Sequence, residues 1–315
     1  MAQASRGLFM TLFKIKRFGA LYPILHFTSY RNPDMFSQLN KPLIMGILNV
    51  TPDSFSDGGK YSGLPDALIQ VERMLAEGVD IIDIGGESTR PGSDSVTPAE
   101  QIQRVIPVIT AIRQQLKSPV LISIDTTSST VAKAALDAGA TIINDVSAGQ
   151  EDPDLFTLAA QMKVPIILMH SQGSPKTMQD NPYYDDVVQD VMKALQDRIK
   201  AALNAGIKKE NIAIDPGIGF GKRKQDNLDL LAHLNTLIEL GFPLLLGTSR
   251  KRFMGTICNV TEPSELVTAT AVTTALGIMA GVQMFRVHDV KENRQAADVA
   301  WAIKQSFKTS KFQGY

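Results

Sequence analysis

The sequence has little cysteine, no long apolar run and no excess of one charge. Its 315 residues include a single cysteine, Cys258, which excludes an internal disulfide and a cysteine metal cluster. We expect this thiol to be a small buried apolar side chain. No run of 18 or more apolar residues occurs, so the sequence predicts no membrane-spanning helix, no membrane partner and a cytoplasmic location.

The charges balance. The chain has 32 lysines and arginines against 32 aspartates and glutamates, and its formal net charge is zero. Nucleic-acid-binding proteins usually carry a strongly basic surface, so a nucleic acid is not an expected partner. The composition, 44% hydrophobic and 20% charged, is that of an ordinary globular protein with length enough for a large core.

Three catalytic signatures are also absent. The H-x-E and H-E-x-x-H patterns of zinc hydrolases do not occur, and neither does the G-x-S-x-G turn that carries a nucleophilic serine. A glycine-rich phosphate turn after the first predicted strand, which an open nucleotide-binding sheet usually has, is missing as well.

What the chain does contain, from residue 43 on, is a regular alternation of short apolar runs and helical segments. The runs are apolar on both faces, as buried parallel strands are. They lie at 43–50, 79–86, 119–125, 140–146, 164–170, 211–217, 242–248 and 282–288. A glycine stands just before five of the strands, where a helix would end: Gly78, Gly139, Gly206, Gly241 and Gly281. Eight such units predict an α/β fold, the single-domain (β/α)8 (TIM) barrel; an open doubly wound sheet is the alternative.

The predicted barrel spans residues 41–308, with an N-terminal extension at 1–40 and a tail at 309–315. The first 27 residues carry four basic side chains and no acid. A dispensable extension is the simplest interpretation, and Met35 is a candidate start; a transit peptide or a basic surface helix are the alternatives.

Polar residues follow every predicted strand, and barrel closure brings strand ends to one rim, where catalysis occurs. They are Asn49; Glu87, Thr89 and Arg90; Asp125; Asn144 and Asp145; His170; Asp215; Ser249, Arg250 and Lys251; and Arg286 and His288. Arg90, Arg286 and His288 form a cationic patch suited to an anion with several oxygens. The opposing set, Asp125, Asn144 and Asp215, is suited to a flat heterocycle with N–H donors. Asn49 offers an oxygen to Mg²⁺ shared with phosphates, while for His170 a structural role and a site role stay equally open.

Two long motifs then indicate a family. MGILNVTPDSFSDGG (45–59) and IIDIGGESTRPGS (81–93) resemble the first two signatures of dihydropteroate synthases. Similar too are SIDT (123–126), IINDV (142–146), LMHSQGSPKTMQ (168–179), IDPGIGFGK (214–222), LLGTSRK (245–251) and RVHDVKE (286–292). The resemblance covers about residues 43–305, in order along the whole barrel.

The resemblance implies a transferase that joins 4-aminobenzoate to the methylene carbon of a dihydropterin diphosphate, releasing diphosphate and forming dihydropteroate. It assigns pterin contacts to Asp125, Asn144, Asp215 and Lys251. It assigns diphosphate contacts to Asn49, Thr89, Arg286 and His288, with Asn49 also a ligand of a Mg²⁺ cofactor. It places Phe55, Arg90, Pro91, Phe220 and Arg252 at the 4-aminobenzoate pocket. The residues it implies for catalysis are Asp57, Arg90, Lys251, Arg286 and His288, and it implies a homodimer.

One departure concerns the 4-aminobenzoate end. Many relatives have a small serine after S-R-K, where this chain has Arg252. The arginine would either bind the substrate carboxylate or point away and leave that contact to a backbone N–H.

The rival interpretations of the function are a methyltetrahydrofolate-binding methyltransferase and a catalytically silent pterin-binding paralogue. We also expect Arg286→Ala to lose most turnover while the fold survives.

Overall fold

The computed structural model of the chain describes residues 35–51, 63–88, 92–93, 95–173 and 176–309. Within these ranges the eight predicted strands all form, each inside its predicted run. They are β1 (Leu43–Asn49), β2 (Ile81–Gly85), β3 (Leu121–Asp125), β4 (Ile142–Asp145), β5 (Ile166–Met169), β6 (Ile212–Asp215), β7 (Leu245–Leu246) and β8 (Met284–Val287). The predictions for Phe55, Asp57, Thr89, Arg90 and Pro91 lie outside the described residues.

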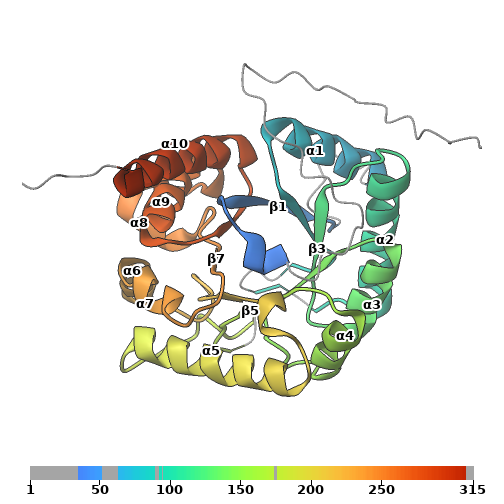
Figure 1. Cartoon of the computed structure of the whole chain (residues 1–315), viewed down its shortest axis with the longest axis horizontal. Coiled ribbons are helices and arrows are strands. Elements are labelled where there is room, and N and C mark those ends of the chain that lie inside the picture. Colours follow the sequence, from blue (N-terminus) through green and yellow to red (C-terminus); the bar gives the residue numbers. More distant parts are fainter. Residues whose placement is uncertain (1–34, 52–62, 89–91, 94, 174–175, 310–315) are drawn as a thin grey trace, which may run out of the picture.

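The strands form one parallel sheet in the order β6-β5-β4-β3-β2-β1-β8-β7. A single parallel bridge between Ile214 and Leu244 joins the β6 edge to the chain just before β7 and so closes the barrel. Figure 1 shows the closed ring of strands inside a ring of helices. The prediction of a (β/α)8 barrel is therefore confirmed, and the open doubly wound sheet is excluded.

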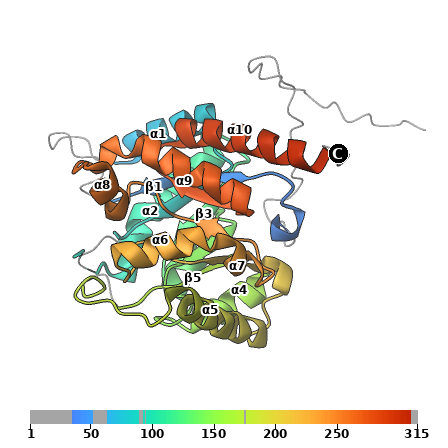
Figure 2. The ribbon, with the colours of Figure 1, turned by 90° about the vertical axis from the view of Figure 1, so that its left-hand side faces the viewer.

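The helices fill the connections between consecutive strands, and the last helix follows β8. They are α1 (Leu64–Glu77), α2 (Pro98–Gln114), α3 (Ser129–Ala138), α4 (Asp154–Met162), α5 (Val187–Asn204), α6 (Lys224–Ala232), α7 (Leu234–Ile238), α8 (Arg252–Cys258), α9 (Val267–Ala280) and α10 (Val290–Thr309). α6 and α7 share one connection, and α8 precedes α9 in another. Seen from the side, α9 and α10 lie next to each other along one flank (Figure 2).

Local sequence explains where helices begin and end. The side chains of Thr97, Ser128 and Asp186 accept hydrogen bonds from backbone N–H groups in the first turns of α2, α3 and α5. The five glycines predicted to follow helices all adopt positive φ angles, between 75° and 117°. Such angles are strained for residues with a Cβ, so each glycine lets the chain turn sharply into the next strand.

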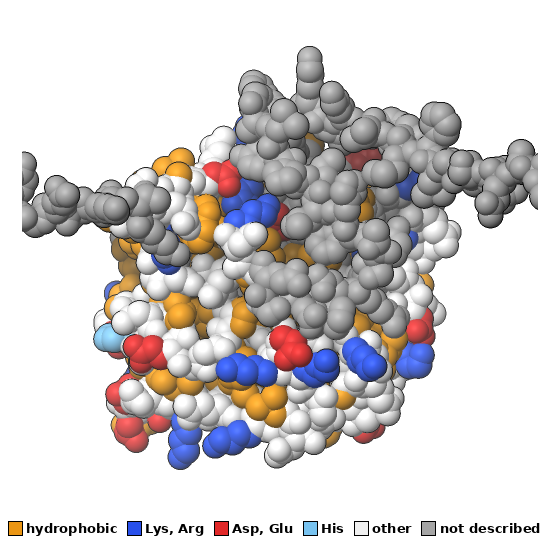
Figure 3. All heavy atoms as spheres, viewed as in Figure 1, with side chains coloured by type: hydrophobic (Ala, Val, Ile, Leu, Met, Phe, Trp, Pro, Cys, Tyr) orange, Lys and Arg blue, Asp and Glu red, His pale blue; other side chains and the backbone are white. Residues whose placement is uncertain are grey.

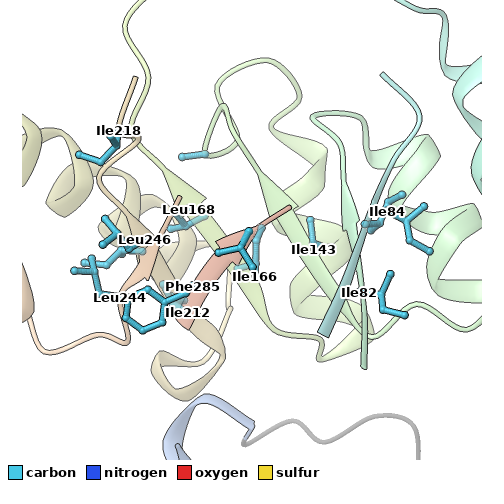
Figure 4. Close-up of a cluster of buried hydrophobic side chains, with 14 of the residues drawn as sticks. Ile82, Ile84, Ile143, Ile166, Leu168, Ile212, Ile218, Leu244, Leu246 and Phe285 are labelled. Atoms are coloured by element: carbon cyan, nitrogen blue, oxygen red, sulfur yellow. The ribbon is translucent and has the colours of Figure 1, made fainter. Parts of the chain in front are cut away.

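The core has two parts, because strand side chains alternate between the two faces of the barrel wall. The side chains that point outward pack under the helices; Figure 4 shows Ile82, Ile84, Ile143, Ile166 and others in this layer. A smaller cluster fills the amino-terminal half of the barrel interior and includes Met45, Ile81, Ile142, Leu245 and Met284. The lower barrel is thus filled by apolar side chains, and polar chemistry is confined to the upper half.

A short 3₁₀ helix, η1 (Met35–Gln38), closes the amino-terminal end of this interior. Met35 and Phe36 are almost fully buried and belong to the same inner cluster as Met45. Among the described residues, packing against the barrel interior thus includes Met35 and Phe36, which lie before the predicted boundary at 41. η1 therefore contributes side chains to the inner core of the barrel.

Cys258, predicted to be buried, is exposed at the end of α8. That prediction was wrong because α8 is a short surface helix that buries only Phe253, Met254 and Gly255.

None of the described helices is long and apolar enough to span a membrane. On the coloured part of the face in Figure 3, acidic and basic side chains are interspersed and form no extended patch of one sign.

Candidate active site

A cavity of about 550 Å³ opens at the carboxyl ends of the strands. This volume is within the range of small-molecule sites. Eight of the predicted site residues line it: Asn49, Asn144, Asp215, Phe220, Lys251, Arg252, Arg286 and His288. The structure thus brings together residues that span 240 positions of the chain, and the prediction that the strand ends meet at one rim is confirmed for them.

Room for a flat ligand comes partly from glycine. Gly247 lines the cavity on the chain just after β7. A Cβ added to it would lie 3.7 Å from Asp215 Oδ2 and 4.0 Å from Arg286 Cβ. A side chain at this position would therefore occupy the space next to the Asp215 carboxylate and the Cβ of Arg286, which glycine leaves open.

Arg286 is the centre of an ionic cluster. Its Nε donates to Asp83 Oδ2 and its Nη2 donates to Asp125 Oδ2, each at 2.6 Å. The sequence analysis had placed Arg286 in a cationic patch opposite Asp125, whereas in the structure the two form an ion pair. The reason is that residues 286 and 125 both project into the upper barrel, where β8 and β3 are close enough for side chains to meet.

This cluster shifts the acid–base properties of its members. Burial raises the pKa of Asp125 to about 7, against the lowering effect of the Arg286 charge. Burial by itself would lower the pKa of the Arg286 guanidinium. The negative charges of Asp83 and Asp125 together have the larger effect, so the pKa is raised above its ordinary value. Arg286 therefore stays charged, while burial favours the neutral form of Asp125.

Asp215 is the second buried carboxylate of the cavity. Burial raises its pKa to about 6, although the Gly217 N–H and the charges of Lys251 and Arg286 favour the ionised form. Its Oδ1 accepts a 2.7 Å hydrogen bond from Gly217 N, whereas Oδ2 has no such bond among the described contacts. Oδ2 is thus the oxygen best placed to accept an N–H from a ligand.

Lys222 is a residue that sequence reasoning did not single out. Its Nζ is within 3.0 Å of His170 Nδ1 and donates to the backbone oxygens of Gly217 at 2.9 Å and Phe220 at 3.0 Å. These contacts fold the loop after β6 back over the end of β5. His170 does not line the cavity, and burial together with Lys222 lowers its pKa to about 3. The structure therefore favours the structural role for His170.

Two contacts join the loops after β7 and β8. Ser249 Oγ lies 2.9 Å from His288 Nδ1 and also accepts a hydrogen bond from His288 N at 3.0 Å. One position further on, Arg250 pairs with Asp289 through Nε and Nη2, at 3.0 and 2.5 Å. The motifs T-S-R-K and R-V-H-D are thus held together, which fixes Lys251 and His288 relative to each other.

This joint gives a test. Arg250 has a left-handed φ of 57°, which is less favourable for arginine than for glycine. We expect Arg250→Ala to lose the ion pair and lower the free energy of unfolding by about 1–2 kcal/mol, since the pair is partly exposed. Arg250→Gly loses the same pair but relieves the backbone, so it should be about 1 kcal/mol more stable than Arg250→Ala. Urea unfolding of both variants measures the difference, and equal stabilities would contradict it.

Lys251 and Phe220, which both line the cavity, contact each other. Lys251 Nζ lies 4.2 Å from the centroid of the Phe220 ring, a cation–π distance. Arg252 begins α8 and is exposed, yet it also lines the cavity. The position of Arg252 agrees with a contact to an anionic substrate group, which is the first of the two alternatives stated above.

Glu87 anchors the base of the loop after β2. Its Oε1 accepts from Val96 N at 2.9 Å and its Oε2 accepts from Gln101 Nε2 at 2.8 Å. Gln101 in turn accepts from Thr126 Oγ1 on the neighbouring connection. Glu87, a strand-end residue in the sequence analysis, therefore ties two loops to α2 and is not a cavity residue. Asp145 is likewise structural, since it accepts from Ser147 and Gly149 N–H groups.

Comparisons with known proteins agree with this geometry. The family model described as "Pterin binding enzyme" matches residues 45–288. A dihydropteroate synthase of Synechocystis is 45% identical over 269 residues, covering 85% of this chain and 92% of the relative.

Solved structures give the same result. That of Yersinia pestis dihydropteroate synthase with a sulfonamide drug has a TM-score of 0.80 and 44% identity, covering 85% of this chain and 96% of the other. That of the Xanthomonas albilineans enzyme with 7,8-dihydropteroate has a TM-score of 0.76 and 41% identity, covering 84% and 95%. The chain belongs to the pterin-binding enzyme family, in the group formed by the dihydropteroate synthases.

Proposed function

We propose that the chain condenses (7,8-dihydropterin-6-yl)methyl diphosphate with 4-aminobenzoate to give 7,8-dihydropteroate and diphosphate, a step of folate biosynthesis. The observation that carries the proposal is that one cavity combines buried carboxylate and amide groups with cationic groups. Asp215 and Asn144 lie with Arg286, Lys251 and His288 around it. A polar ring that carries a diphosphate needs both kinds of group.

The pterin ring is recognised by the deep end of the site. Its aminopyrimidinone edge presents N–H donors, and the carboxylate of Asp215, which lines the cavity, can accept them through Oδ2 while Oδ1 accepts from Gly217 N. Asn144 supplies an amide group from β4 that lines the same cavity. Lys251 supplies a cation for the ring carbonyl or N5 side. Buried hydrogen-bonding groups of this kind reject ligands that leave them unpaired, so the deep end is the specific part of the site.

The chemical step is a substitution at the pterin methylene carbon. The bond to the diphosphate oxygen breaks, the leaving group departs with the electron pair, and the ring delocalises the resulting positive charge. The amine of 4-aminobenzoate attacks the carbon and then loses a proton to solvent. This amine is unprotonated at neutral pH, so no strong base is needed, and catalysis depends on stabilising the leaving diphosphate through Asn49, Arg286 and His288.

The residues present fit a magnesium ion only in a limited sense. No group of three or more histidine, cysteine or acidic side chains in the described part of the chain is arranged to hold a metal by itself. Asn49 offers one amide oxygen at the rim of the cavity, and Mg²⁺ commonly takes one or two protein oxygens together with phosphate oxygens. We therefore expect Mg²⁺ to bind with the substrate, where it would neutralise charge on the departing diphosphate.

The 4-aminobenzoate end is proposed to lie at Phe220 and Arg252. Phe220 offers a ring face beside Lys251, and Arg252 is a cation near the entrance. A substrate with an aromatic ring and a carboxylate matches that pair. The Yersinia relative is solved with a sulfonamide drug, and we expect sulfonamides to compete with 4-aminobenzoate at this end.

Diphosphate release tests the proposal directly. The purified chain is incubated with the dihydropterin diphosphate, 4-aminobenzoate and Mg²⁺, and diphosphate and dihydropteroate are measured together. We expect equal amounts of both products, and none when 4-aminobenzoate is omitted. Binding of the pterin substrate without turnover would indicate a catalytically silent pterin-binding protein and overturn the proposal.

A homodimer is the proposed assembly. α9 and α10 pack against each other and expose a row of large apolar side chains: Val272, Leu276 and Met279 on α9, and Val299, Ile303 and Phe307 on α10. An exposed apolar patch of this kind is typical of an interface with another protein surface. Analytical ultracentrifugation should give twice the chain mass of 34.3 kDa. The cytoplasmic location stays a prediction of the sequence.

A further inference from the structure

Asp83 lies one layer below the rim, inside the barrel. It is the third residue of β2 and is fully buried. The strand register places it beside Ile47 of β1 and Ser123 of β3, whose side chains share its inward direction. Asp83 does not line the cavity, and no role in the reaction has been assigned to it above.

One oxygen of Asp83 holds two residues that come from opposite sides of β2. Oδ2 accepts from Arg286 Nε at 2.6 Å and from Asn144 Nδ2 at 3.2 Å. In the sheet, β8 and β4 each lie two strands away from β2, in opposite directions. A single buried carboxylate therefore connects the proposed diphosphate residue Arg286 with the proposed pterin residue Asn144.

The contact to Asn144 fixes which end of its amide faces Asp83. A carboxylate only accepts hydrogen bonds, so it must meet the NH₂ group of Asn144 and not the carbonyl oxygen. The two ends of an amide have almost the same shape, so only such a partner determines their orientation. Asn144 Oδ1 is therefore the amide atom that points away from Asp83 and remains as an acceptor for a ligand N–H.

The contact to Arg286 fixes the plane of the guanidinium in the same way. Asp83 accepts a hydrogen bond from Nε and Asp125 accepts one from Nη2, so the two carboxylates bind two different nitrogens of one planar group. Rotation about the last bonds of the arginine would break both contacts. The remaining edge is then held in a single direction at the cavity.

From this geometry we propose that Asp83 is a positioning residue for the reaction: it sets the hydrogen-bonding polarity of Asn144 for the pterin ring and the plane of Arg286 for the leaving diphosphate. The inference rests on the proposed function, because it assumes that a pterin occupies the cavity. Asp83 does not touch substrate and acts only through these two side chains.

The test is Asp83→Asn, which keeps the shape but replaces an acceptor-only group with one that also donates. Asn144 can then flip and offer NH₂ to the ligand, and Arg286 loses a charged partner. We expect affinity for 6-hydroxymethylpterin, measured by calorimetry, to fall on the order of 10- to 100-fold. The KM for the dihydropterin diphosphate should rise with it, while the KM for 4-aminobenzoate stays near the wild-type value.

Asp80→Asn is the matched control. Asp80 pairs with Arg294 at 3.0 Å beside the start of β2, at the opposite end of the barrel from the cavity. Its loss also breaks an aspartate–arginine pair, but we expect pterin affinity and both KM values to stay unchanged. A double-mutant cycle adds a second readout: if Asp83 acts through Asn144, the effects of Asp83→Asn and Asn144→Ala should be clearly less than additive.

The outcomes separate the two claims. If the wild-type chain does not bind 6-hydroxymethylpterin, the proposed function fails. If it binds and folded Asp83→Asn binds equally well, or if both KM values rise together, Asp83 is not a positioning residue. Should Asp83→Asn fail to fold, a structure of the wild-type chain with the pterin decides: an N–H of the ligand opposite Asn144 supports the inference, and a ligand acceptor there overturns it.

Discussion

Arg286→Ala is expected to lower the free energy of unfolding by about 3–5 kcal/mol, in addition to removing most turnover. The motif pattern alone predicts a loss of turnover with an intact fold. The structure adds a second effect, because Arg286 is the partner of two buried carboxylates, Asp83 and Asp125. Without the guanidinium, two negative charges face each other in the barrel with no cation between them. Urea unfolding followed by circular dichroism measures the loss.

The pH dependence of that loss identifies its cause. At pH 5 a proton can neutralise Asp125, whose pKa is already about 7 in the native chain and would rise further without Arg286. The stability gap between wild type and Arg286→Ala should therefore be smaller at pH 5 than at pH 8. The double variant Arg286→Ala/Asp83→Asn should regain part of the stability at pH 8. A gap that is the same at both pH values would show that lost packing, not uncompensated charge, destabilises the variant.

The fold was predictable because its signals are repeated and local. Each strand is a short run that is apolar on both faces, and a glycine such as Gly139 or Gly281 ends the preceding helix with a positive φ. These features depend only on neighbours in the chain. Repetition of one unit eight times then leaves few architectures, and the bridge from Ile214 to Leu244 confirms the closed one.

The rim of the site was predictable for a related reason. Parallel strands in a barrel all point the same way, so residues at equivalent ends, such as Asn49, Asp215 and His288, must meet whatever the helices do. The family resemblance then gave these positions roles in a reaction. It also gave roles to Phe55, Asp57, Thr89, Arg90 and Pro91, which stay predictions.

The residues beneath the rim were not predictable from the chain. Asp83 sits within I-I-D-I-G, a run with the same pattern as its neighbouring strands, and only the register of β2 against β1 and β3 shows that it points inward. Lys222 was not found for another reason: its hydrogen-bonding partners are loop backbone oxygens and His170, which is 52 positions away. Such contacts join residues that are far apart in the sequence, so the periodic pattern of apolar residues does not predict them.

The contribution of residues before the barrel was not predictable either. The predicted boundary at residue 41 follows from the regular alternation of strands and helices, which begins at residue 43. Met35 and Phe36 are apolar side chains that close the open lower end of the barrel. An end of a barrel needs a cover because the inner faces of the strands would otherwise leave apolar surface in water, and nothing in the sequence of η1 itself reveals that partner.

The second large effect is expected in the pH dependence of pterin binding. The ionised form of Asp215 is the one that accepts N–H groups of the ring, and burial has raised its pKa to about 6 from an ordinary value of 3.8. Binding should therefore be strongest above pH 7 and weaken as the pH falls through 6, by about tenfold at one pH unit below the pKa. Calorimetry with 6-hydroxymethylpterin, which lacks the titrating diphosphate, measures this change.

Stability of the free chain should move in the opposite direction over part of the same range. A carboxyl group with a raised native pKa binds its proton more tightly when folded than when unfolded. Its contribution to the free energy of unfolding is therefore fully present below pH 3.8 and is lost as the pH rises through about 6. The same burial that makes Asp215 a strong acceptor for the pterin thus favours its neutral form in the empty site.

Proton release on binding joins the two effects in one experiment. Near pH 6, a ligand that requires ionised Asp215 must expel the proton from the fraction of molecules that still hold one. Calorimetry in two buffers of different ionisation enthalpy should detect this release near pH 6 and find almost none at pH 8. Asp215→Asn, which cannot ionise, should bind weakly and lose the part of the release that comes from this position. Proton uptake on binding, or the same release in Asp215→Asn, would mean that the pterin does not depend on the ionised carboxylate of Asp215.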